Sequence, residues 1–173
     1  MRAGRIVFGV VVAVASAMAL AGVGPARAQQ TASSFKSGAW IGRAHFDAQQ
    51  VFQYCLVYRR RPDGLEFGFR VTKELVMMIG LSNPGWNMPA STGYEFSVEL
   101  GDYKKSHRGA VTAEVRSTLW INVGNDADLR RAIAGGGTLN LVGKDNSKFA
   151  LDIGGADNAM RKLLACTALY GVE

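Results

Sequence analysis

Large apolar residues alternate with polar residues through the middle of the chain, a pattern typical of β-strands that bury one face. The first such stretch covers 52–58 and the second covers 65–71. Between them lies Arg61-Pro62-Asp63-Gly64, which suits a tight turn because proline presets one backbone dihedral and glycine allows positive φ. These segments predict a β-hairpin. Further strands are predicted at 40–46, 75–81, 94–100, 111–115, 119–123, 139–142 and 149–153.

Two later segments have helical spacing instead. Asn125 or Asp126 can cap a short helix that runs to Ala134 and carries Leu129 and Ile133 on one face. A second helix is predicted from Asp157 to about Gly171, with apolar residues three and four positions apart. Because the strands follow one another through short turns, antiparallel pairing is favoured over parallel crossovers. We therefore predict a mainly β domain, either a β-sandwich or a curved antiparallel sheet, with one short helix and a C-terminal helix.

The first 28 residues have the three parts of a secretory signal peptide. Arg2 and Arg5 precede the uncharged segment 6–21, and Ala26-Arg27-Ala28 forms a small-x-small cleavage site. The alternative is an uncleaved anchor, but the apolar segment is shorter than the roughly 20 residues that span a bilayer. Cleavage after Ala28 would lower the formal net charge from +6 to +3. The expected mature chain has no transmembrane segment, a flexible polar leader at 29–38 and a single domain at 39–173.

The chain has two cysteines, Cys55 and Cys166. Exported proteins meet oxidising conditions, so a structural disulfide between them is the simplest prediction. Such a bond would tie an early strand to the last helix. The alternative is a nucleophilic cysteine, which would need one of the two histidines, His45 or His107, as its base. No C-x-x-C redox motif is present.

Two basic groups and one tryptophan are candidate binding residues. Arg59, Arg60 and Arg61 lie at the tip of the first predicted hairpin. If the second group lies on the same side, the two would form a positive patch for an anionic envelope component or an acidic protein. The alternative is two ordinary solvated turns. Trp86 either packs under its loop or forms an exposed contact site. The second basic group lies in the predicted loop after Leu100: Lys104, Lys105, His107 and Arg108.

Catalytic, metal and cofactor signals are weak. Two histidines and two distant cysteines do not make a structural zinc site, and no phosphate-loop or dinucleotide motif is present. Gly154-Gly155 precedes a predicted helix but lacks such a motif, which favours a plain turn. The sequence therefore predicts no cofactor, no metal and no catalytic residue. The modest mature charge and predicted export also argue against nucleic acid as a partner. An enzyme site would have to assemble from scattered residues such as His45, Asp47, His107 and Glu114.

The order and spacing of several aromatic residues, a turn glycine and both cysteines resemble those of known proteins. The chain resembles a group of small, uncharacterised exported proteins from alphaproteobacteria, and is more distantly similar to the invasion-associated locus B family. The resemblance implies a bacterial periplasmic or secreted protein with a disulfide, and it supplies no catalytic residues. Its positions are Trp40, Phe52-x-x-Cys55, Gly64-x-x-Phe67, Ile79-x-Leu81, Pro84-x-Trp86, Gly93-Tyr94, Phe149-x-Leu151 and Ala159-x-x-x-Leu163-x-x-Cys166.

The leading functional hypothesis is thus a non-enzymatic exported binding protein that acts in the cell envelope or in host interaction. A second hypothesis is an inhibitor of a periplasmic or host hydrolase such as lysozyme, because a small disulfide-bonded domain can insert a loop into an active site. The third is an enzyme built from the scattered residues above.

Overall fold

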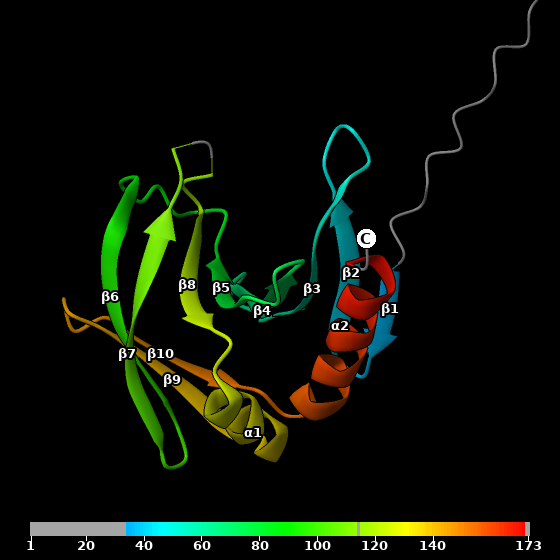
Figure 1. The fold of residues 1–173 in the computed structure, drawn as a ribbon. Coiled ribbons are helices and arrows are strands. Elements are labelled where there is room, and N and C mark those ends of the chain that lie inside the picture. Colours follow the sequence, from blue (N-terminus) through cyan, green and yellow to red (C-terminus); the bar gives the residue numbers. More distant parts are fainter. Residues whose placement is uncertain (1–33, 114, 172–173) are drawn as a thin grey trace, which may run out of the picture.

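A computed structural model describes residues 34–113 and 115–171. The predicted signal peptide lies outside these residues. The described chain forms one antiparallel sheet and two helices (Figure 1). The strands are β1 (Ser34–Ser37), β2 (Trp40–Phe46), β3 (Phe52–Arg60), β4 (Glu66–Thr72), β5 (Met77–Ser82), β6 (Ser91–Leu100), β7 (Tyr103–Val111), β8 (Thr118–Gly124), β9 (Thr138–Gly143) and β10 (Lys148–Asp152), and the helices are α1 (Ala127–Gly135) and α2 (Ala156–Tyr170).

The strand order in space is β1-β2-β3-β4-β5-β8-β7-β6-β9-β10. The sheet curves so strongly that its last strand returns to its first ones (Figure 1). Trp40 in β2 donates its indole N–H to the carbonyl of Gly154, just after β10, at 3.0 Å. Arg61 donates to the carbonyl of Ala150 in β10 at 3.2 Å. The curved-sheet alternative of the fold prediction is therefore the one the protein adopts.

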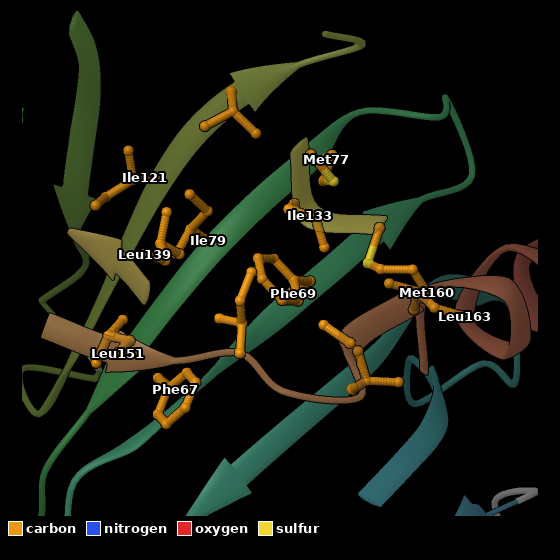
Figure 2. Close-up of a cluster of buried hydrophobic side chains, with 14 of the residues drawn as sticks. Phe67, Phe69, Met77, Ile79, Ile121, Ile133, Leu139, Leu151, Met160 and Leu163 are labelled. Atoms are coloured by element: carbon orange, nitrogen blue, oxygen red, sulfur yellow. The ribbon is translucent and has the colours of Figure 1, made fainter. Parts of the chain in front are cut away.

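The inner face of the sheet holds a single apolar core (Figure 2). The inward residues of β4 and β5 meet Leu139 and Leu151 from the returning strands, together with Ile133 from α1 and Leu163 from α2. Burial of this kind stabilises a fold by about 25 cal/mol per Å² of apolar surface.

The predicted disulfide is confirmed. Cys55 in β3 is bonded to Cys166 in α2, with a Cα–Cα distance of 6.1 Å. Both cysteines are buried. The bond therefore fixes α2 against the first half of the sheet. No cysteine in the described residues is free, so neither is placed as a nucleophile.

Both predicted helices are confirmed, and their ends follow the sequence signals. Asp126 caps α1, because its carboxylate accepts from the backbone N–H groups of Asp128 and Leu129 at 2.9 and 3.0 Å. Gly136 ends α1 with a positive φ of 72°, which glycine adopts without strain. Gly154-Gly155 is a turn that leads into α2, with the Gly154 carbonyl used by Trp40.

Three local predictions need correction. Ser34–Ser37, placed in the flexible leader, form β1 and pair with β2. The predicted strand at 111–115 is wrong, since β7 ends at Val111. The second basic group lies in β7 rather than in a loop. The sequence of β7 does not show the usual alternation of apolar and polar residues. Lys105 and His107 occupy inward positions of this strand, at the edge of the core, where apolar residues are expected.

Candidate functional site

The first basic group is held by acidic and carbonyl oxygens. Arg59 donates to the carboxylate of Asp152 at 3.1 Å, and Arg60 pairs with Glu66 across the hairpin. Arg61 pairs with Asp63 at 2.9 Å. These contacts fasten the hairpin to β10 and neutralise the positive charge on which the predicted patch depends.

The second basic group is paired as well, on different elements. Lys104 lies 2.7 Å from the carboxylate of Glu99 in β6, and Lys105 lies 2.7 Å from that of Asp126 at the start of α1. Arg108 is exposed on the outer face of β7. The contacts of the two groups have no residue in common in the described part of the chain. A joint positive patch thus stays a prediction. Carboxylates of the same chain already neutralise much of the positive charge of the two groups.

Asp126 is the centre of a polar network that positions α1. One carboxylate oxygen caps the helix, and the other accepts from Lys105 and from the Tyr103 hydroxyl at 3.1 Å. The bond from Lys105 is the main reason that the pKa of Asp126 lies well below its usual value. Burial, followed by the bond to Asp126, raises the pKa of Tyr103 far above its usual range. The network stays ionised at the carboxylate and neutral at the phenol at neutral pH.

His107 lies at the end of this network. Its Nε2 atom is 2.8 Å from the Tyr103 oxygen. Because the Tyr103 proton points to Asp126, we assign the proton of this contact to His107 Nε2. Burial lowers the pKa of His107, which favours the neutral ring.

The scattered residues of the enzyme hypothesis are not brought together. His45 stacks on Tyr54 at 4.7 Å on the outer face of β2, whereas His107 points inward from β7. Four strands separate β2 from β7. Asp47 is occupied by the turn before β3, where it accepts from the backbone of Gln49 and Val51. Glu114 lies outside the described residues.

Trp86 lines an apolar pocket whose other walls come from β6, β8, β9 and β10. The cavity has a volume of about 420 Å³. Trp86 is half-buried, and its ring meets that of Phe149 edge-to-face with 5.8 Å between the ring centres. Its side chain therefore forms a wall of the pocket rather than an exposed contact site. Glu95 and Lys144, which pair at 2.5 Å, lie among the polar groups of the lining. The lining is mainly apolar and also includes Met88, Tyr94, Phe96 and Leu119.

The loop that carries Trp86 is pinned in place. Tyr94 donates its hydroxyl to the carbonyl of Pro89 at 2.9 Å, and Arg116 donates to the carbonyl of Met88 at 2.8 Å. The backbone N–H of Met88 returns a bond to the Arg116 carbonyl at 3.0 Å. The pocket is therefore formed before any ligand arrives, which lowers the entropic cost of binding.

Sequence reasoning selected Trp86 but missed the other walls of the pocket. Tyr94, Phe96 and Phe149 fit the alternation of core strands, and nothing in their spacing distinguishes a pocket wall from a core residue. The pairing of β6 with β9 brings the two sides together. Those strands are not consecutive, so no local signal predicts that pairing.

Comparison with known proteins finds a match among solved structures. No family model matches the chain, and no curated protein matches its sequence. A crystal structure of invasion associated protein B from Bartonella henselae matches with a TM-score of 0.55 at 13% identity, over 79% of this chain and 98% of that one. At this identity the match shows a shared fold. It supports the distant similarity to the invasion-associated locus B family that the sequence indicated.

Two kinds of feature are absent from the described residues. Among them, no helix has both the length and the apolar character needed to cross a bilayer. Within the same ranges, no three histidine, cysteine or acidic side chains gather as a metal site would require.

Proposed function

We propose that this chain is a non-enzymatic, exported binding protein of the bacterial envelope or of the host interface. In this proposal the Trp86 pocket takes a ligand with an apolar group beside a polar one. The observation that carries it is the preformed cavity of about 420 Å³ with aromatic walls and the Glu95–Lys144 pair in its lining. Pockets of this size with few polar groups at the mouth of a curved sheet are typical ligand sites.

Export is supported by two features. The buried disulfide suits an oxidising compartment, and the fold resembles that of invasion associated protein B. Mass spectrometry of the periplasmic fraction should find a chain that begins at Gln29. A cytosolic chain that keeps Met1 and two free thiols would contradict this part of the proposal.

A neutral fluorescent probe, N-phenyl-1-naphthylamine, tests the pocket. We expect saturable binding to the oxidised protein, and at least about tenfold weaker binding by Trp86→Glu, because a carboxylate would then face the apolar cavity. Leu169→Glu is the matched control, since Leu169 is 71% exposed on α2 and outside the pocket. Absence of saturable binding, or equal loss in both variants, would refute the assignment of this pocket.

A further inference from the structure

The outer face of the central strands is turned away from α1 and α2 (Figure 1). This face carries a second hollow. Gly68 in β4 is paired directly with Gly80 in β5. Tyr58 pairs with Gly68 from β3, and Trp120 pairs with Gly80 from β8. The two glycines give the hollow a floor without side chains of its own, with Tyr58 beside Gly68 and the Trp120 ring against Gly80. The cavity above this floor, which we call the glycine groove, has a volume of about 340 Å³.

The two glycines are required where they stand. A Cβ atom on Gly80 would lie 2.5 Å from the Trp120 ring, and one on Gly68 would collide with the Val57 carbonyl oxygen. No larger residue fits either position without displacing its neighbour. Glycine inside a strand costs stability and often marks a close approach. The groove is thus a fixed feature of the sheet.

Two arginines stack on the aromatic walls. The Arg70 guanidinium lies 4.1 Å from the Trp120 ring centre and 5.1 Å from that of Tyr54. Arg43 lies 5.7 Å from the centre of the Tyr58 ring. A stacked guanidinium keeps its in-plane N–H donors open to a carboxylate or a phosphate.

These arginines differ from the basic groups that the sequence singled out. Within the described residues, neither Arg43 nor Arg70 forms an ion pair with a carboxylate. Arg70 donates to the Met78 sulfur at 2.8 and 3.0 Å, and sulfur is a weak acceptor. Burial lowers the pKa of Arg70. Arg43 is exposed and lines the groove, so its charge is open to an anionic ligand there. Arg70 is half-buried and lies outside the lining, against the Trp120 ring.

The other side of the groove offers hydroxyl and carboxylate groups. The Thr118 hydroxyl donates to that of Ser82 at 2.9 Å, which leaves the Ser82 proton for a ligand. Glu66 receives both bonds from Arg60 on one oxygen, Oε1, and keeps Oε2 as an acceptor. The free Oε2 atom can accept a hydrogen bond from a sugar hydroxyl.

We propose that the glycine groove binds an acidic polysaccharide, a chain of sugar rings that carry carboxylates. One carboxylate bonds to Arg43 in the groove, and the chain continues past the Trp120 wall so that a second carboxylate reaches Arg70. Ring hydroxyls bond to Glu66, Ser82 and Thr118. A single strand of nucleic acid fits less well, because the arginines already stack on the aromatic rings. An anionic membrane fits less well, because the groove is recessed. The site lies on the opposite face of the sheet from the Trp86 pocket, so each proposal can fail without the other.

Calorimetric titration of the oxidised, full mature chain tests the ligand class. An oligogalacturonate should bind with an affinity that falls as salt is raised, since exposed charges are screened. Maltohexaose, an uncharged oligosaccharide, should bind much more weakly. The proposal is overturned if the oligogalacturonate does not bind at millimolar concentration. Tighter binding of oligo-dT or of phosphatidylglycerol vesicles would overturn it in favour of those ligands.

Variants then test the site. Arg43→Gln with Arg70→Gln should weaken oligogalacturonate binding at least about tenfold, through loss of two charged hydrogen bonds. Arg131→Gln on α1 removes one positive charge, as Arg43→Gln does, from a side chain that is 78% exposed, and should change the affinity little. Because Arg70 is packed between rings, Arg43→Gln alone provides the second measurement and should weaken binding severalfold. Equal loss in Arg131→Gln, or no loss in Arg43→Gln, contradicts the site.

A charge-neutral pair separates a sugar site from a general anion site. Ser82→Ala with Thr118→Val removes two hydroxyl groups and leaves the net charge unchanged. Oligogalacturonate binding should fall severalfold if sugar hydroxyls are bound there. Unchanged affinity would show that only charge is recognised, and would overturn the polysaccharide assignment.

Discussion

The two faces of the central strands differ in chemical character, although each strand supplies alternate residues to both. The inner positions of β4, β5 and β8 are apolar and almost fully buried: Phe67, Phe69, Ile79, Leu81 and Ile121. The outer positions hold Gly68, Gly80 and Trp120 around a groove, and Arg70 stacks on the Trp120 ring beside it. One strand can thus supply stability with one set of positions and binding with the other. The difference implies that each can be altered separately.

The largest expected effect comes from the bond that anchors α2 to the inner face. Replacing Cys55 and Cys166 by alanine opens a loop whose ends are 111 residues apart. In the chain-entropy model this lowers the free energy of unfolding by about 4–5 kcal/mol. Urea unfolding followed by circular dichroism measures the loss.

A reducing agent is the control for that variant. Dithiothreitol should destabilise the wild type by a similar amount and leave the double variant unchanged. If the double variant kept wild-type stability, the tie between β3 and α2 would have no role in holding the inner face.

The sharpest contrast between the faces comes from two isoleucines. Ile79 is 1% exposed on the inner face of β5, whereas Ile41 is 38% exposed on the outer face of β2. Ile79→Ala should cost about 2–5 kcal/mol through lost burial and a cavity. Ile41→Ala should stay within about 0.5 kcal/mol of the wild type. Chemical unfolding of both variants gives the comparison, and equal costs would contradict the division into two faces.

The sequence predicted the features that depend on local pattern. The first hairpin, both helices and the Asp126 cap follow from alternation, helical spacing and turn residues. With only two cysteines, the disulfide needed no choice among partners. The basic groups were found, but two of their acidic partners, Asp152 and Asp126, lie far away along the chain and could not be foreseen.

The glycine groove was missed for a related reason. Gly80 and Trp120 become neighbours only because β5 pairs with β8 rather than with β6. Nothing in the spacing of these residues predicts a non-consecutive pairing. Outward aromatic residues and glycines in strands are also common on ordinary surfaces. The unpaired state of Arg43 and Arg70 depends on the tertiary fold, so it could not be seen in composition or charge.

A smaller effect should come from filling the floor of the groove. Gly80→Ala places a methyl group against the Trp120 ring, and such overpacking costs about 1–3 kcal/mol. In a Trp120→Ala background the same change should cost little, because the ring is gone. Unfolding free energies of the two single variants and the double variant give the coupling. An additive result would show that Trp120 does not rest on Gly80.

The smallest effect concerns the charge of Asp126, a polar group at the edge of the inner face. Asp126→Asn keeps a residue that caps helices well but removes the charge that faces Lys105 and Tyr103. At neutral pH we expect a loss of about 1 kcal/mol, since Lys105 is partly exposed and its attraction is screened. The folded-state pKa of Asp126 lies below the unfolded value of about 3.9. Its contribution is therefore complete above that value and declines as the pH falls toward the folded pKa. Urea titrations of both proteins between neutral and acidic pH should show their stabilities converging below about pH 4. Asp128→Asn, which alters a more exposed carboxylate, should show a smaller change. A stability difference that grows on acidification would contradict the pairing of Asp126 with Lys105.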